Sequence, residues 1–125
     1  MNDLDKIENS IAHARKVIAK GDALQRLMDN SDFKAVVLEA YLKDEPVRMV
    51  HYYGSGIGSP EEKAEIERDM HGVGALKSFF SMIMNAASQA DSDLQSALAA
   101  REEYIAQAQA NEEEVFVEDR RGLGA

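Results

Sequence analysis

The residues best suited to chemistry in this 125-residue chain are three histidines, several serines and one glycine-rich loop. Glu67 and His71 are four residues apart, so a helix would bring both side chains to one face, as a metal pair or an ion pair requires. A di-iron helical bundle needs a repeated Glu-x-x-His motif with further inward carboxylates, and the sequence lacks this pattern. We therefore predict no metal site and interpret His71 as a surface or half-buried residue.

The remaining polar residues show no catalytic arrangement. His13 falls on the charged side of a predicted helix, and His51 lies in an apolar, aromatic segment. The serines have neither a nucleophile-elbow sequence nor a base at a recognisable spacing. Asp91 and Asp93 point to different faces of a helix, whereas general acid–base catalysis needs groups that converge in a cleft. The sequence therefore predicts no catalytic residue and no enzyme.

Gly54, Gly56 and Gly58 suggest a phosphate-binding loop, but the context argues against one. A dinucleotide fingerprint follows a strand in a βαβ unit, and a Walker loop needs Gly-Lys-Ser/Thr. Here Ser59-Pro60-Glu61-Glu62 follows and places negative charge where a phosphate would bind. We predict no nucleotide and no other cofactor.

Helices must position all these residues, and the longest is predicted to begin after Ser59. Serine at the N-cap, Pro60 at the first helical position and Glu62 at the third form a capping box. Apolar residues then recur in steps of three and four, which predicts one helix over about 60–113 with a single apolar stripe. Gly72 and Gly74 mark either a kink or a close helix approach. The stripe consists of Ile66, Met70, Val73, Leu76, Phe80, Ile83, Ala87, Ala90, Leu94, Ala97, Leu98 and Ile105.

An N-terminal helix is predicted over about 3–28. Its apolar residues have the spacing of a coiled-coil seam, and Asn2 or Asp3 can cap its start. Gly21 either ends this helix or only weakens it by about 1 kcal/mol; we favour a continuous or slightly bent helix. The seam residues are Leu4, Ile7, Ile11, Ala14 and Ile18.

A middle helix is predicted after the turn and cap at Asn30-Ser31-Asp32, with a break near Pro46. Proline cannot supply an interior N–H, and it biases Glu45 out of the helical region. The segment 47–53 is predicted to continue as one or two helical turns, with a strand as the alternative. The apolar face of the first part consists of Phe33, Val36, Val37, Ala40 and Tyr41.

The predicted fold is an all-α, elongated helical hairpin or bundle, with one domain over 1–114 and an extended tail over 115–125. After Asp91 the helix is rich in alanine and has few large side chains, so its partner is the N-terminal helix or another copy of the chain. Val115-Phe116-Val117 is strand-like, which suggests either addition to a partner's sheet edge or a disordered end. The pairing of the long helix, within one chain or between chains, stays open at this point.

Composition and charge narrow the class of protein. The chain has no cysteine, no secretory signal at its N-terminus and no apolar run of about 18 residues, which predicts a soluble protein without a membrane span. The formal charge is −9, and residues 91–125 contribute nine acids against three bases. Without a basic stripe, we expect no direct nucleic-acid binding. The acidic end is either a solvated surface or a contact for a basic partner.

Two runs of sequence resemble a known group of proteins. These runs are Asp32-Phe33-Lys34-Ala35-Val36-Val37-Leu38-Glu39-Ala40-Tyr41 and Glu45-Pro46-Val47-Arg48-Met49-Val50-His51. They are similar to segments of small acidic helical proteins from tailed-bacteriophage structural-gene modules, over roughly residues 20–95. The resemblance implies a virion or virion-assembly protein, provides no catalytic motif, and does not extend to residues 115–125.

The sequence therefore leads to the hypothesis of a non-enzymatic structural or assembly protein of a tailed phage, located in the virion or the infected-host cytoplasm. Its expected partners are itself, as a homo-oligomer, or a larger phage structural protein, or both. The alternative is an acidic phage regulatory protein that binds and inhibits a host protein. The predicted partner-binding residues are Leu94, Leu98, Ile105, Val115, Phe116, Val117, Arg120 and Arg121.

Overall fold

The computed structural model describes the backbone of residues 2–123 and the side chains of residues 2–115. Its elements are helices throughout this part of the chain, which confirms the predicted all-α fold class. In chain order they are α1 (Asp3–Asp29), α2 (Ser31–Phe33), a π-helix η1 (Lys34–Asp44), α3 (Glu45–Gly54) and α4 (Pro60–Leu123).

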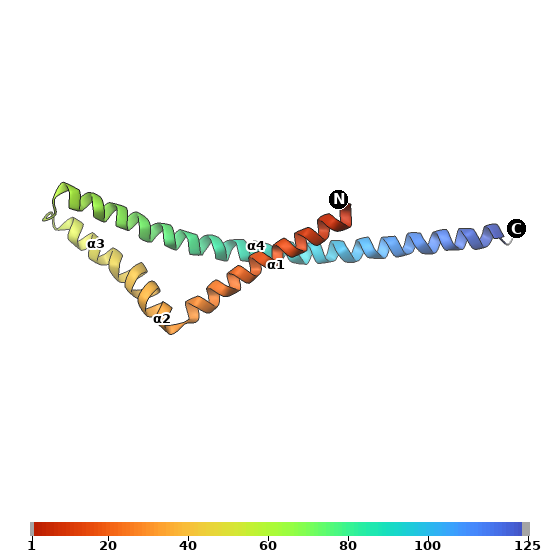
Figure 1. Ribbon diagram of the computed structural model, residues 1–125, viewed down its shortest axis with the longest axis horizontal. Coiled ribbons are helices and arrows are strands. Elements are labelled where there is room, and N and C mark those ends of the chain that lie inside the picture. The colour runs from red at the N-terminus through yellow and green to blue at the C-terminus, as the bar shows by residue number, and fades with distance from the viewer. Residues whose placement is uncertain (1, 124–125) are drawn as a thin grey trace.

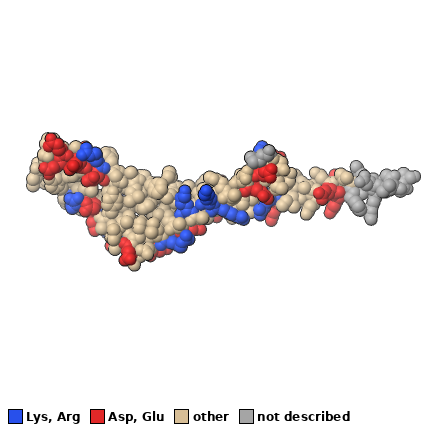
Figure 2. Space-filling view, in the orientation of Figure 1, with Lys and Arg blue, Asp and Glu red and all other residues tan. Residues whose placement is uncertain are grey.

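The helices form an open triangle with one long side (Figure 1). Helix α1 crosses α4 near the middle of the molecule and runs in the opposite direction. The chain then turns at α2, returns through η1 and α3, and reaches the start of α4 through a short loop. Because α4 is much longer than α1, its C-terminal part extends beyond the end of α1, and the whole molecule is elongated (Figures 1 and 2).

Helix α1 is a single helix that holds half of the buried apolar side chains. The Asn2 side chain accepts a hydrogen bond from the Asp5 N–H (2.8 Å), and the Asp5 carboxylate accepts one from the Asn2 N–H (3.4 Å), which completes a capping box. Gly21 does not interrupt the helix; it is buried, and a Cβ built there would lie closer than 3.0 Å to the Ala87 Cβ. Glycine is therefore required at the point where α1 and α4 touch.

Six apolar side chains are buried, and four of them, Ile11, Ala14, Val73 and Ala90, come from the predicted stripes. Each is no more than 5% exposed, which marks a thin core between α1, α3 and α4. Phe33 of α2 adds a ring contact with Phe80 of α4, with centroids 6.0 Å apart. The buried residues are Ile11, Ala14, Leu24, Met49, Val73 and Ala90.

The middle segment is helical on both sides of the predicted break at Pro46. In η1 the hydrogen bonds run from residue i to i−5, as in the bond from the Glu45 N–H to the Ala40 carbonyl, and the pitch changes to an α-helix at Glu45. The expectation that Glu45 leaves the helical region is wrong, because its φ and ψ are −62° and −46°. Pro46 lies in the first turn of α3, directly after η1, where the φ that its ring fixes suits a helix. The strand alternative for 47–53 is also wrong, since α3 covers this segment.

Helix α4 begins as predicted, with the Ser59 Oγ accepting a hydrogen bond from the Glu62 N–H at 3.2 Å. It continues through Gly72 and Gly74, and a Cβ at Gly72 would lie 3.7 Å from the Tyr41 hydroxyl. Its backbone is helical to Leu123, so α4 includes residues 115–123, for which the sequence favours an extended tail. Residues 75–121 contain neither proline nor glycine, so nothing in this stretch of the sequence breaks the helix before Gly122.

Candidate protein-protein interface

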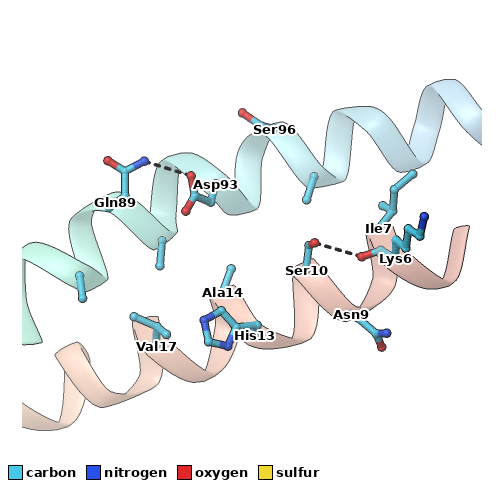
Figure 3. A pocket seen from close by; sticks show the side chains of 13 residues that line it. Lys6, Ile7, Asn9, Ser10, His13, Ala14, Val17, Gln89, Asp93 and Ser96 are labelled. Atoms are coloured by element: carbon cyan, nitrogen blue, oxygen red, sulfur yellow. Dashed lines mark hydrogen bonds between the residues drawn. The ribbon is translucent and has the colours of Figure 1, made fainter. Parts of the chain in front are cut away.

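An open groove of about 850 Å³ lies between the first half of α1 and the middle of α4 (Figure 3). Both walls of this groove are helical. The α1 wall contains Lys6, Ile7, Asn9, Ser10, His13, Ala14 and Val17, and the α4 wall contains Ala86, Gln89, Ala90, Asp93, Ser96 and Ala97.

The chemistry of this groove suits helix packing. Four of its lining residues are alanines, and small side chains allow another helix to approach closely. Its polar groups bond within their own helices: the Gln89 Nε2 donates to the Asp93 Oδ1 (3.0 Å), and the Ser10 Oγ donates to the Lys6 carbonyl (3.0 Å) (Figure 3). These groups do not converge on one point, as a catalytic site would require.

A second feature is the part of α4 that extends beyond the N-terminus of α1. We call it the arm and define it as residues 105–115. Every residue of the arm is exposed, whereas Tyr104, directly before it, is half-buried. Ile105 is 43% exposed and Val115 is 58% exposed. A helix of this kind buries its apolar residues only when a partner covers them.

The predicted partner-binding residues divide into three groups. Leu94 and Leu98 are half-buried in the part of α4 that α1 covers, so they contribute to packing within the chain. Ile105 and Val115 lie on the exposed arm, where a partner can reach them. The remaining four, Phe116, Val117, Arg120 and Arg121, lie outside the residues whose side chains the structure describes.

Other large apolar side chains are exposed on η1, α3 and α4, and one of them, Val36, was expected on an inward apolar face. Val36, Val47 and Val50 are 65%, 55% and 60% exposed. The interpretation of Val36 as part of an inward face fails because the π-helical register of η1 changes the residues that share a face. On α4, Phe79 and Met82 are 50% and 58% exposed beside the buried stripe. The molecule therefore presents apolar surface at several places besides the arm.

Two tyrosines fasten the end of α3 to the start of α4. The Tyr53 hydroxyl donates to the Glu67 Oε1 at 2.9 Å, and the Tyr52 hydroxyl donates to the Glu62 Oε2. The hydrogen bond from Tyr52, together with those from Ser59, lowers the pKa of Glu62, and the bond to Glu62 raises the pKa of Tyr52. Glu67 is thus bonded to Tyr53, and among the described residues no group of three or more His, Asp or Glu could hold a metal ion.

Charge is unevenly distributed along the molecule (Figure 2). Lysine and arginine side chains gather over the middle, whereas acidic side chains gather at the start of α4 and again on the arm. Residues 6–20 of α1 contain four bases and one acid, and residues 102–115 of α4 contain five acids and no base. These two segments therefore have opposite net charge, while the lining of the groove itself holds one base, Lys6, and one acid, Asp93.

Comparison with protein-family models, with curated proteins and with solved structures found no match. In the described part of the chain, no helix has a stretch long and apolar enough to cross a bilayer.

Proposed function

We propose that this chain is a non-enzymatic virion structural or virion-assembly protein of a tailed phage, such as a minor head-associated, adaptor or scaffold-like protein. It works by packing exposed helical surfaces against copies of itself and against a larger structural protein. Its place of action is the virion or the cytoplasm of the infected host.

The observation that carries this proposal is the exposed arm of α4. The arm extends past α1 with Ile105 and Val115 uncovered, and the rest of the fold is an elongated frame with a thin core. Exposed apolar surface of this extent is typical of proteins that assemble with others. The resemblance of residues 32–41 and 45–51 to phage structural-module proteins supports the same class.

The first experiment is the solution mass of the full chain and of a chain that ends at residue 104. The cut belongs at 104 because residues 94–104 include several half-buried side chains, which a shorter chain would lose. We expect a multiple of 13.8 kDa for the full chain and a helical monomer for the truncated one. Mass spectrometry of purified phage particles then tests the virion assignment, which is refuted if the protein is absent from both mature particles and assembly intermediates.

The acidity of the arm favours a second candidate, a phage regulatory protein that binds and inhibits a host protein. Glu112, Glu113 and Glu114 follow one another on an exposed helix, where they suit a basic partner surface. This candidate predicts a monomeric full chain and a protein that is absent from particles. The same two measurements therefore separate the two proposals.

A further inference from the structure

We propose that the arm of one copy docks in the groove between α1 and α4 of a second copy, and that the two copies exchange arms in an antiparallel, two-fold symmetric dimer. This inference rests on the proposed function and deepens it, because it names the contact through which the chain assembles.

The arm belongs to a helix that continues to Leu123, and it is long enough to span the groove. The α4 wall of the groove runs from Ala86 to Ala97, and the arm runs from Ile105 to Val115. At 1.5 Å per residue each stretch is about 17 Å long. Ile105, Ala108 and Val115 share one face of the arm at helical spacing, so they can pack on the alanines of the groove as a third helix.

The arm and one wall of the groove lie on the same helix, α4. Two copies can therefore each place an arm in the groove of the other. The centre of the α4 wall lies near residue 92 and the centre of the arm lies near residue 110. A two-fold axis near residue 101 therefore brings each arm to the groove of the other copy. Both contacts form together, so the interface is twice the size of a single docked arm, and closed two-fold symmetry is the commonest form of self-association.

Charge complementarity selects a second copy as the occupant. In this register Glu112, Glu113 and Glu114 of one copy lie opposite α4 residues near Ala87 of the other copy. Gly21 of α1 packs on Ala87 at this point. Lys16 and Lys20 lie on α1 within two turns of that point, and both are exposed. In the described part of the chain they have no ion-pair partner. The acidic end of the arm therefore meets bases that the monomer leaves unpaired.

Charge reversal tests the contact, with the solution mass as the readout. An arm variant (Glu112→Lys, Glu113→Lys and Glu114→Lys) and a groove variant (Lys16→Glu and Lys20→Glu) each place like charges together in a dimer. We expect a wild-type mass of about 27.6 kDa, twice the 13.8 kDa of one chain, and dimerisation weakened on the order of 100-fold in each variant. Far-UV circular dichroism confirms that each variant is still helical.

Mixing the two variants provides the decisive result. In the mixed dimer the lysine arm meets the glutamate groove, and the unchanged arm meets the unchanged groove, so both contacts become attractive again. We expect the mixture to form heterodimers, and a single chain with both sets of changes to form homodimers. The matched control reverses Glu61, Glu65 and Asp69 at the far end of α4; it changes the net charge as much as the arm variant and should keep the wild-type mass.

Cross-linking tests the antiparallel register. The chain has no cysteine, so a single introduced one reports only its own position. Ala100→Cys lies beside the inferred axis and should cross-link to its counterpart through a short bismaleimide. Ser92→Cys should not, because about nine residues separate it from the axis, which places the two copies of it about 27 Å apart along the helices.

The outcomes separate this inference from the proposed function. A wild-type oligomer that the arm and groove variants leave unchanged overturns arm exchange, while assembly through another surface stands. Cross-linking of Ser92→Cys in preference to Ala100→Cys overturns the register and therefore the inference. A wild-type chain that stays monomeric over the micromolar range also overturns it, and the particle analysis then decides the proposed function alone.

Discussion

Replacing Gly21 with alanine should destabilise the protein, although the same substitution normally stabilises a helix. Alanine in a helix interior is favoured over glycine by about 0.8–1.0 kcal/mol. At Gly21, however, the new Cβ would lie closer than 3.0 Å to the Ala87 Cβ, and neither group can rotate away. At Gly74, by contrast, a Cβ would meet nothing within 4 Å, so Gly74→Ala is the matched control.

The size of the effect follows from the helix separation. Ordinary contact between such atoms is 3.4–4 Å, so α1 and α4 must move apart by roughly 1 Å at their crossing. Overpacking of this kind typically costs about 1–3 kcal/mol. After the gain in helix propensity, Gly21→Ala should lower the free energy of unfolding by about 0–2 kcal/mol, while Gly74→Ala should raise it by about 1 kcal/mol.

Urea unfolding, followed by circular dichroism at a fixed protein concentration, measures this difference. The concentration is fixed because self-association contributes to apparent stability. The double variant Gly21→Ala with Ala87→Gly moves the methyl group from one helix to the other and should return close to wild type, since the clash and the propensity change both cancel. Equal stabilisation by Gly21→Ala and Gly74→Ala would refute the close helix crossing.

Two further predictions concern the start of α4. Ser59→Ala removes the cap on the Glu62 N–H and should lower the free energy of unfolding by about 1 kcal/mol, whereas Ser78→Ala on the exposed face of α4 should change it by less than about 0.5 kcal/mol; equal effects would contradict the capping role. Because the pKa of Glu62 is lowered below 4.5 in the folded protein, chiefly by the Tyr52 hydroxyl, its contribution to stability is present above pH 4.5 and is lost as the pH falls through the lowered pKa. Tyr52→Phe should therefore reduce the fall in the urea midpoint between about pH 7 and about pH 3, and an unchanged fall would contradict this account.

The elements of the fold with strong local signals were predictable from the sequence. The capping residues Asn2 and Ser59 begin helices where expected, and the apolar stripe supplies Val73 and Ala90 to the core. These predictions succeed because a cap and a helical stripe depend on residues only a few positions apart. Gly21 was ambiguous because its role depends on Ala87, which only the tertiary structure brings near.

The middle segment was less predictable. A π-helix over Lys34–Asp44 has no clear sequence signature, and its wider turn rotates later residues away from the faces that a period of 3.6 assigns. The exposure of Val36, which a period of 3.6 places on the apolar face, follows from this change of register. Glu45 stays helical before Pro46 because the proline falls in the first turn of α3.

The candidate interface was predicted in part. Ile105 was found from the stripe, but Leu94 and Leu98 belong to the contact with α1, because the sequence does not say where the covering helix ends. The groove was missed for the same reason, since half of its lining comes from α1. The available signal in the sequence was the opposite net charge of residues 6–20 and 102–115. It can be interpreted only when the structure shows that residues 6–20 pack along α4.

The crossing of α1 over α4 also determines how the chain folds. All-helical proteins usually fold quickly because their contacts are local in sequence. Here Gly21 packs on Ala87, so about 66 residues separate the two sides of the central contact. The chain must therefore close a long loop before α1 and α4 can pack together. The entropic cost of this closure is offset only by the burial of a thin core. The protein therefore combines contacts that are mostly local with one central contact between distant parts of the chain.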